Sequence, residues 1–455
     1  SDLIITPEVS SIMTPDRKKL YQYSFSMFKD PFLKEVKKLS KKYRKWIIIG
    51  SISVLDRKKL KNRSIVIDPK GKIVAFYDKI NLFDVTINSK EKYLEARNYK
   101  KEHGKISFIS STLSTIITLS LLYFGIYGWV SDYFVMNYEN YFIQSGLFFL
   151  SFFLLNTIVS IPFQYYSTFY IEEKYGFNKT TLKVFITDRI KGILLSILIG
   201  GLILFIALFI YQKIENNFWI YLWIFISAFI IFIQMFYTSL IVPLFNKLTP
   251  LQEGSLKNKI NEYSQKIGYS IDNIFIIDGS KRSTKANAYF SGFGPKKTIA
   301  LFDTLVEKHT EDELVAVLAH EVGHYKKKHI FQGLIISIFQ IGLMAFLLEL
   351  CLNNEILIKS LGGTTPAFHL GIIIFSFLFS PIGLIMGTFM NMISRKNEFE
   401  ADNYAKETYN GDSLVLALKK LYVDSLSNIY PHPLYVFFHY SHPPLLERIK
   451  KIEGN

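Results

Sequence analysis

The sequence of 455 residues contains a single cysteine, Cys351. One cysteine excludes a disulfide scaffold, a cysteine-rich zinc finger and an iron–sulfur protein. Proline and glycine are also sparse, with 14 and 25 residues, whereas hydrophobic residues make up 49% of the chain. This composition excludes a disordered or collagen-like protein and indicates a chain with extensive apolar surface to bury.

Six apolar runs are long enough, at about 20 residues, to cross a bilayer. The clearest of them, 218–243, contains no charged residue. One such run could be a buried helix of a water-soluble protein, but six in one chain favour an integral multi-pass membrane protein. No signal peptide precedes them, so we expect these internal runs to insert the chain. The runs are 106–128, 142–164, 192–212, 218–243, 330–352 and 368–393.

Positive charge is concentrated in the first part of the chain. Residues 1–105 contain 25 Lys and Arg residues against 12 Asp and Glu, whereas the remainder is close to neutral. A basic chain can bind nucleic acid, but the apolar runs favour the lipid bilayer as the partner, with no nucleic acid. The positive-inside rule places the N-terminus, 165–191, 246–329 and the C-terminus in the cytoplasm, because these parts are rich in Lys and Arg.

These patterns divide the chain into five regions. A basic α/β segment, 1–90, is followed by four spans in 91–245, a polar insertion in 246–329, two spans in 330–393 and a C-terminal helix and tail in 394–455. Within the insertion, short strands are expected at 273–278, 286–292 and 297–303. Thr310 and Glu313 have the spacing of a capping box, which predicts a helix that begins at Glu311.

The segment His320-Glu321-Val322-Gly323-His324 carries the strongest chemical signal. Residues four apart share one face of a helix, so both imidazoles can reach one metal ion, and Glu321 can act on a metal-bound water. The pattern alone also occurs by chance on solvated helix faces. Here the helix has an apolar side, and two buried histidines would be unfavourable without a partner. We therefore expect one Zn²⁺ ion, with His320 and His324 as ligands.

A catalytic zinc site needs a third protein ligand. Glu398 is the best candidate, because it lies with Asp402 on one face of a helix that we expect to start where the last span leaves the membrane. Asp402 would then hydrogen-bond a ligand histidine. Glu400 points to another side of this helix, and we expect it to be solvated.

Five segments, in order, resemble the zinc-dependent CaaX prenyl protease 1 family: 171–180 (IEEKYGFNKT), 286–293 (ANAYFSGF), 297–305 (KTIALFDTL), 320–329 (HEVGHYKKKH) and 441–448 (SHPPLLER). The resemblance covers about 90–455. It implies a mainly α fold, a multi-span transmembrane helical barrel around a large intramembrane chamber, with a cytoplasmic zinc-metalloprotease insertion.

The resemblance also implies residue roles. His320, His324 and Glu398 match the zinc ligands, and Glu321 matches the general base. The strand at Asn287 and Ala288 matches the edge that pairs with substrate backbone. His442 matches a histidine that hydrogen-bonds the tetrahedral oxyanion, although it could equally be a structural residue of the turn before Pro443. For His329 we expect a supporting or interfacial position rather than a fourth ligand position.

Residues 1–90 resemble another family, the carbon–nitrogen hydrolase (nitrilase) superfamily, in the pieces 4–8, 46–51, 62–64 and 77–85. Glu8 and Lys79 match that superfamily's general base and lysine. Its nucleophile is a cysteine well after the lysine, and Cys351 lies inside a predicted span. The resemblance therefore implies a truncated α/β segment, half of an α-β-β-α sandwich, without amidase activity. This segment replaces the spanning helix that the CaaX family has before 91–105.

The combined hypothesis is a membrane-integral zinc metalloendopeptidase that hydrolyses C-terminal CaaX-type or membrane-associated protein substrates, prenylated or not. A zinc-activated water would attack, with Glu321 as the general base. The location would be a bacterial inner membrane or the endoplasmic reticulum, with the zinc site on the cytoplasmic side. The alternative is a degraded or chimeric, catalytically inactive membrane protein that lacks the family's first helix. The sequence leaves the oligomeric state open.

Overall fold

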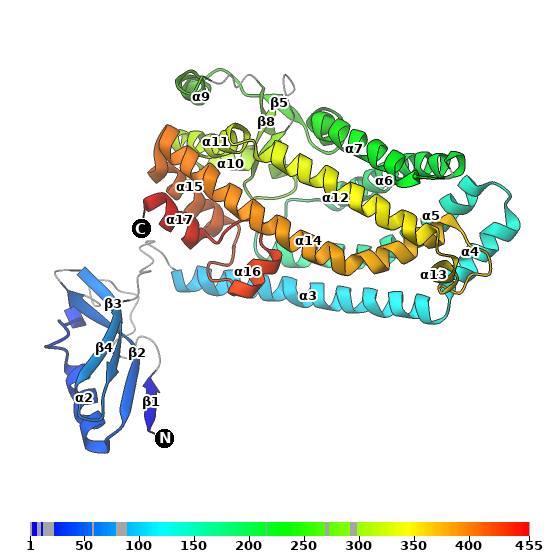
Figure 1. Ribbon diagram of the computed structural model, residues 1–455. Helices are drawn as coiled ribbons and strands as arrows, with labels where there is room; N and C mark the ends of the chain where they lie inside the picture. The colour runs from blue at the N-terminus through cyan, green and yellow to red at the C-terminus, as the bar shows by residue number, and fades with distance from the viewer. Residues whose placement is uncertain are drawn as a thin grey trace. The chain divides into compact units, whose positions relative to one another are not determined.

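The computed structural model describes residues 2–6, 11, 22–56, 59–78, 89–214, 216–268, 273–291 and 298–454. The chain forms two compact units, Ser1–Ser89 and Lys90–Asn455, and each is described by itself (Figure 1). Glu8 and Lys79, which match catalytic residues of the nitrilase superfamily, lie outside the described residues.

The first unit is a four-stranded sheet with one helix packed on it. Its strands are β1 (Leu3–Thr6), β2 (Trp46–Asp56), β3 (Lys59–Ile67) and β4 (Ile73–Asp78), in that spatial order, with β1 parallel to β2 and the other pairs antiparallel. The sequence predicted an α/β segment here but not the position of helix α2 (Pro31–Tyr43). Asp30 caps α2 by accepting a hydrogen bond from Leu33 N at 2.9 Å. Leu33 and Val36 bury this helix against the isoleucines of β2 and β3.

The described residues of the second unit contain six helical segments that are long and apolar enough to cross a membrane. They lie in α3 (Ser89–Tyr123), α5 (Tyr141–Tyr166) with η1 (Ser167–Glu172), α6 (Leu182–Lys213), α7 (Phe218–Phe236) with η2 (Tyr237–Ile241) and α8 (Val242–Phe245), α12 (His329–Leu352) and α14 (Phe368–Ala405). Two short helices, α4 (Ile126–Asn137) and α13 (Glu355–Lys359), lie between spans.

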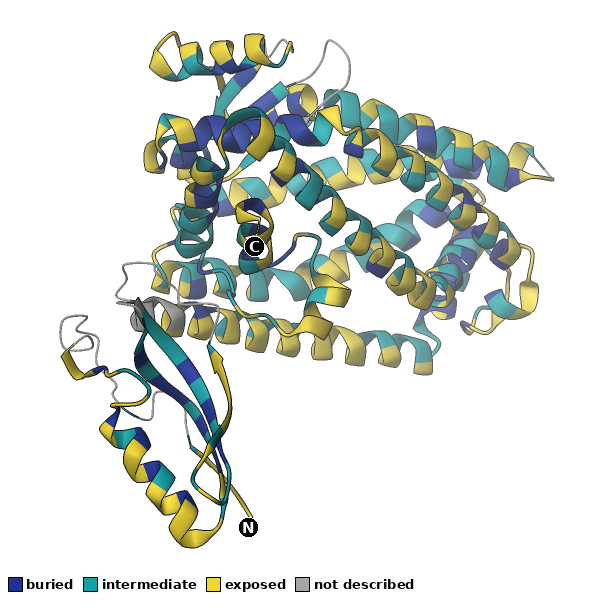
Figure 2. Cartoon of the chain, turned by 60° about the vertical axis from the view of Figure 1, so that its left-hand side comes forward, coloured by how far each residue is buried: buried dark blue, intermediate teal, exposed yellow. Residues whose placement is uncertain are grey.

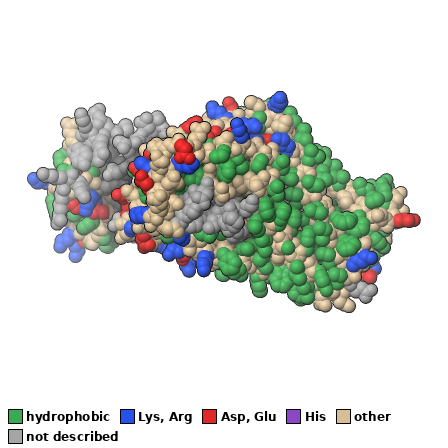
Figure 3. Space-filling view, turned by 90° about the horizontal axis from the view of Figure 1, so that it is seen from above, with side chains coloured by type: hydrophobic (Ala, Val, Ile, Leu, Met, Phe, Trp, Pro, Cys, Tyr) green, Lys and Arg blue, Asp and Glu red, His purple; other side chains and the backbone are tan. Residues whose placement is uncertain are grey.

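The long helices carry their apolar side chains on the outside. Phe108, Leu198 and Phe339 are each exposed over at least 70% of their surface. Exposed residues follow the outward faces of these helices (Figure 2), and hydrophobic side chains dominate the surface over them (Figure 3). Such a surface is unfavourable in water but suits the hydrocarbon of a bilayer. The predicted integral membrane protein is confirmed.

The helix boundaries differ from the prediction in two places that matter for the site. Helix α3 begins at Ser89, well before the apolar run that starts at 106. Its first turns are polar, so the apolar pattern alone did not reveal them. Helix α14 continues without a break from the last span through Glu398 and Asp402. The expectation of a separate helix that starts outside the membrane is therefore wrong. No glycine or proline interrupts 391–405, so the hydrogen-bonded ladder continues.

The polar insertion forms a second sheet of spatial order β5-β6-β8-β7, with β5 (Leu248–Pro250), β6 (Ile274–Ile277), β8 (Thr298–Phe302) and β7 (Ala288–Ser291). Its helices are α9 (Ser255–Lys266), α10 (Asp303–Lys308) and α11 (Glu311–Lys326). The expected capping box is present, because Thr310 accepts from the Glu313 backbone while the Glu313 side chain accepts from Thr310 N. Helix α11 therefore begins at Glu311, as predicted.

Helix α11 is the centre of the largest buried cluster. It packs against the C-terminal helices α15 (Gly411–Asp424) and α17 (Leu445–Glu453) and against α9 and α14. Figure 1 shows α11, α15 and α17 gathered at one end of the unit, while α12 and α14 run side by side away from it. A further short helix, α16 (Pro433–His439), lies beside α14. The sequence thus brings the two predicted ligand segments, on α11 and α14, into direct contact.

Candidate metal centre

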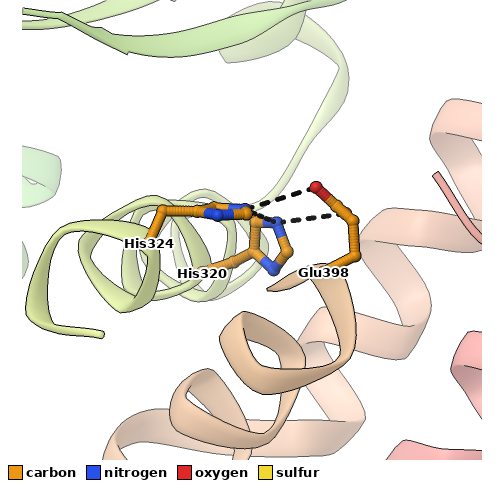
Figure 4. A group of neighbouring side chains, drawn as sticks. All are labelled: His320, His324 and Glu398. Atoms are coloured by element: carbon orange, nitrogen blue, oxygen red, sulfur yellow. Dashed lines mark hydrogen bonds and ion pairs between the residues drawn. The ribbon is translucent and has the colours of Figure 1, made fainter. Parts of the chain in front are cut away.

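Gly323 sets the close approach of the two ligand helices. A Cβ atom at this position would lie 3.1 Å from Ala401 Cα and 3.2 Å from Ala401 O, so only glycine fits without moving the backbone. His320 and His324 flank Gly323 on α11, and Glu398 precedes Ala401 on α14. The crossing therefore presents both imidazoles to one carboxylate (Figure 4).

The three side chains point their donor atoms at one another. His320 Nε2 and His324 Nε2 are 3.2 Å apart. Glu398 places Oε2 3.5 Å from His320 Nε2 and Oε1 3.3 Å from His324 Nε2. Donors in tetrahedral contact with zinc, at bond lengths of about 2.0–2.2 Å, are separated by about 3.3–3.6 Å. The structure therefore brings together the three predicted ligands at separations that suit a zinc ion.

The chemistry of this group also fits a cation. Glu398 is buried, and its Oε2 atom accepts no hydrogen bond among the described residues, although it lies at ion-pair distance from Arg448 Nη1. Two imidazole Nε2 atoms that face each other at 3.2 Å would repel if both carried lone pairs and nothing lay between them. Two nitrogens and one carboxylate oxygen are a common donor set for catalytic zinc, which keeps a fourth position open. The residues present therefore fit the expected metal.

Asp402 lies behind His320, as expected. Its Oδ1 atom is 3.0 Å from His320 Nδ1, an ion-pair distance, although the pair lacks hydrogen-bond geometry. Arg448 holds the same carboxylate from the other side, donating from Nε at 2.8 Å and from Nη2 at 2.6 Å. Asp402 is therefore fixed in place between α11 and α17.

The sequence analysis did not single out Arg448. This side chain is buried and reaches Glu398 Oε2 through Nη1 at 3.2 Å. Burial alone lowers the pKa of a guanidinium, but the hydrogen bonds to Asp402 raise the pKa of Arg448 above its ordinary value, so it stays charged. The sequence does contain a sign of this position, because Arg448 lies between Leu445 and Ile452 at the spacing of the buried face of α17. A charge on that stripe indicates a buried partner.

Glu321 lines a pocket of about 220 Å³ together with two residues of the metal group, His320 and Glu398. Burial raises the pKa of the Glu321 carboxyl above its ordinary value. The same pocket is lined by His320, Glu398, Asn287, Ala288 and His442, and by apolar residues of α10, α11 and α15. Six of the predicted site residues thus surround one cavity, although they come from four separate segments of the chain.

His442 reaches the metal group from the C-terminal segment. Its Nε2 atom lies 3.3 Å from Glu398 Oε1, and its Nδ1 atom lies 2.9 Å from Ser441 Oγ. The side chain remains 61% exposed, so it is accessible to a molecule in the pocket. This position can serve either a turn or a substrate contact.

Asn287 and Ala288 lie at the edge of the second sheet. Strand β7 pairs with β8 through Ala288 and Leu301, and among the described residues its other side has no strand partner. Asn287 O accepts a hydrogen bond from Phe302 N at 3.0 Å. The free edge of β7 therefore borders the pocket that contains Glu321.

Glu400 is not simply solvated, in contrast to the expectation. Its carboxylate is 41% exposed, and its Oε2 atom lies 3.1 Å from His329 Nε2. The expectation came from the helical wheel of α14 alone, whereas His329 approaches from the first turn of α12.

Two family models match adjoining parts of the chain. Residues 83–247 match the CAAX prenyl protease N-terminal model, described as five membrane helices, and residues 250–455 match peptidase family M48. The CAAX prenyl protease 1 homolog of Oryza sativa subsp. japonica is 37% identical over 381 residues, which cover 81% of this chain and 89% of that relative. The chain belongs to the CAAX prenyl protease 1 family.

Further comparisons agree. The CAAX prenyl protease 1 of Saccharomyces cerevisiae is 40% identical over 315 residues, covering 66% of this chain and 70% of the relative. The human homolog is 33% identical over 413 residues, which cover 81% of this chain and 87% of that relative. The crystal structure of S. mikatae Ste24p matches with a TM-score of 0.77 at 34% identity, covering 82% of this chain and 91% of that one. The chain is therefore a membrane metalloendopeptidase, and the predicted family and helical membrane fold are confirmed.

Residues 1–127 match the carbon–nitrogen hydrolase family, which confirms the second resemblance. The match overlaps the one to the CAAX protease N-terminal model from residue 83 onward. That model is described as five membrane helices, whereas the described residues of 83–247 contain four candidate spans. The spans are Leu94–Tyr123, Tyr141–Glu172, Leu182–Lys213 and Phe218–Phe245.

Proposed function

We propose that this protein is a zinc-dependent endopeptidase that cleaves peptide bonds near the C-terminus of CaaX-type or other membrane-associated proteins. The observation that carries the proposal is one pocket, in which Glu321, His320 and Glu398 lie beside the free edge of β7. His324 completes the group of three donors with His320 and Glu398. A base, a metal group and a place for an extended peptide are the parts that peptide hydrolysis needs.

Zinc, when bound, supplies Lewis-acid polarisation of the scissile carbonyl and a lowered pKa for water. Glu321 is the general base in this proposal. Its raised pKa suits a group that takes a proton from the attacking water and delivers it to the leaving amine. Asp402 and Arg448 hold His320 and Glu398 in place, so the ligands do not have to reorganise when substrate enters.

The substrate backbone pairs with β7 near Asn287 and Ala288. Main-chain hydrogen bonds to an edge strand give affinity with little dependence on side-chain sequence. His442 then donates a hydrogen bond to the oxyanion that develops as the carbonyl is attacked. Its exposed position at the rim of the pocket supports this role.

The name that these relatives share, CAAX prenyl protease 1, supports prenylated CaaX proteins as the substrate class. The site faces the cytoplasm in this proposal, because the Lys- and Arg-rich parts of the chain flank it. The endoplasmic reticulum membrane is then the expected location in a eukaryotic cell.

A second candidate, a catalytically inactive chimera, is favoured by one observation. The described residues of 83–247 contain four candidate spans, whereas the family model is described as five membrane helices. A bundle without one helix could leave its chamber open to lipid.

The test compares wild-type protein with Glu321→Gln in detergent, on a farnesylated CaaX peptide and on an unprenylated membrane protein. We expect wild type to bind about one zinc ion and to cleave the farnesylated peptide, and Glu321→Gln to bind zinc without cleaving. Glu307→Gln, an exposed carboxylate in α10, is the matched control and should behave like wild type. Cleavage of only the unprenylated protein would exclude the CaaX substrate. Trace metal and no cleavage in wild type would favour the inactive chimera.

A further inference from the structure

Two side chains outside the three-ligand group extend from His324 to the surface. His324 Nδ1 lies 3.1 Å from His329 Nδ1, and His329 Nε2 lies 3.1 Å from Glu400 Oε2. His329 is buried, and its ring stands at 72° to the ring of His324 with the centroids 5.2 Å apart. The three residues form one line from the metal group to a half-exposed carboxylate.

A break between two helices makes this contact. In an uninterrupted helix, a residue five positions after His324 would lie about 140° around the axis and could not face it. Helix α11 instead ends at Lys326 and α12 begins at His329, with Lys328 in the left-handed conformation at φ 61°. Non-glycine residues rarely adopt this conformation, which has an energetic cost. Contacts that the break permits offset the cost of the left-handed conformation at Lys328. The contact between His329 and His324 is one of them.

The hydrogen positions along this line follow from the metal group. His324 Nε2 faces His320 and Glu398, so as a ligand atom it carries a lone pair and no proton. The proton of His324 is then on Nδ1 and must be donated to His329 Nδ1, which accepts. The proton of His329 is consequently on Nε2 and is donated to Glu400. Each ring nitrogen of His324 and His329 is then either a donor or an acceptor with a partner.

We propose that His329 and Glu400 are positioning residues that orient His324 for the metal, an inference that rests on the proposed function. Glu400 fixes the tautomer of His329, and His329 fixes the tautomer and the ring angle of His324. His329 is not itself a ligand of the same ion, because it contacts the Nδ1 side of His324, opposite to the Nε2 atom that faces Glu398. His320 has a different support, the carboxylate of Asp402.

Removal of such a supporting group typically weakens metal binding by about 10- to 100-fold. The test uses two substitutions of nearly equal shape. Asparagine at position 329 offers an oxygen close to the position of His329 Nδ1 and can accept from His324, whereas leucine cannot. The dissociation constant for zinc is measured on the full-length protein in detergent by competition with a chromophoric chelator.

We expect His329→Leu to raise the zinc dissociation constant by about 10- to 100-fold and His329→Asn to stay within a few-fold of wild type. Glu400→Met, at a half-exposed position that tolerates substitution, should raise the constant by a smaller factor than His329→Leu. Glu307→Met, which removes an exposed carboxylate of α10 outside the metal group, is its matched control and should have no effect.

The outcomes separate this inference from the proposed function. An unchanged zinc constant in both His329→Leu and Glu400→Met, in protein that still loses activity with Glu321→Gln, overturns the positioning role alone. Equal losses in His329→Leu and His329→Asn would also overturn it, because packing rather than hydrogen bonding would then matter. If wild type binds no zinc, the proposed function itself fails. If His329→Leu does not fold, Glu400→Met and its control decide the question.

Discussion

Lys285 Nζ lies 2.8 Å from Glu172 Oε2, and this ion pair fastens the segment before β7 to a membrane helix. Tyr99 of α3 completes the contact, because its hydroxyl accepts from Lys285 Nζ at 2.7 Å and donates to Glu172 Oε1 at 2.6 Å. Lys285 lies two residues before Asn287, which borders the pocket that contains Glu321 together with Ala288. The polar insertion and two of the membrane helices are thus joined two residues before the proposed substrate edge.

The first prediction is that Lys285→Met weakens substrate binding more than it slows the chemical step. The substitution leaves Glu172 without its cation, and a hydrogen bond to a charged group contributes about 1.5–3 kcal/mol. A loss of that size at the substrate edge corresponds to a fall of roughly 10- to 100-fold in kcat/KM. Steady-state kinetics on the farnesylated peptide should show the loss mainly in KM, because β7 contributes binding and not proton transfer.

Lys281→Met serves as the control, since Lys281 is exposed in the same segment and forms no ion pair among the described residues. A kcat effect with an unchanged KM in Lys285→Met would contradict a role in holding the substrate edge.

The second prediction concerns the helix crossing. Gly323→Ala places a methyl group 3.1 Å from Ala401 Cα, and backbone atoms cannot move aside as a flexible side chain would. We expect α11 and α14 to separate by a few tenths of an ångström, at a cost of about 1–3 kcal/mol in the free energy of unfolding. Zinc affinity should fall as well, because Glu398 moves away from both histidines.

Gly333→Ala in α12 is the matched control, since a Cβ atom there would meet nothing within 4 Å. Alanine in a helix interior is favoured over glycine by up to about 1 kcal/mol, so this variant should be neutral or slightly more stable. Chemical denaturation gives the free energy of unfolding of both variants, and competition with a chelator gives their zinc affinity. Equal behaviour of the two alanine variants would show that the close approach at Gly323 is unimportant.

The third prediction is that removal of metal inactivates the protein reversibly without unfolding it. Helix α11 is held by a large apolar cluster and by its capping box, neither of which involves the donor atoms. A ligand that binds only the folded state stabilises it by about 2.7–4.1 kcal/mol at 100 to 1,000 times its dissociation constant. Chelation should therefore lower the midpoint of unfolding and leave the helical circular dichroism signal unchanged at 25 °C. Loss of that signal on chelation, or failure of zinc to restore activity, would contradict this account.

Much of the fold and site was predictable because the decisive signals are local. A charge-free run such as 218–243 has few alternatives to a membrane helix. The capping box at Thr310 and the spacing of His320 and His324 place two donors on one face. Glu398 was found because it lies four residues before Asp402 on a helix.

The remaining features depend on contacts between distant segments. Arg448 meets Asp402 from a helix 46 positions along the chain, and no local pattern specifies that pairing. The contact of Glu400 with His329 depends on the left-handed residue Lys328, and a lysine gives no sign of that conformation. Helix α2 was missed because its Lys-rich sequence carries only a narrow buried stripe, made of Leu33, Val36 and Ser40.

The last prediction is that the protein has no amidase or nitrilase activity, despite the match of residues 1–127 to the carbon–nitrogen hydrolases. That chemistry requires a thiolate beside its base. The only cysteine in the sequence is Cys351, which is buried within α12 and packs with Tyr127, Phe148 and Leu370 among the membrane helices. It belongs to the second unit and lies in an apolar cluster of buried side chains. We expect Glu321→Gln protein, in which peptidase activity is absent, to release no ammonia from simple amides or nitriles, and Cys351→Ala to retain wild-type cleavage of the farnesylated peptide. Amide hydrolysis that disappears with Cys351→Ala would show that the thiol is reachable and would overturn this argument.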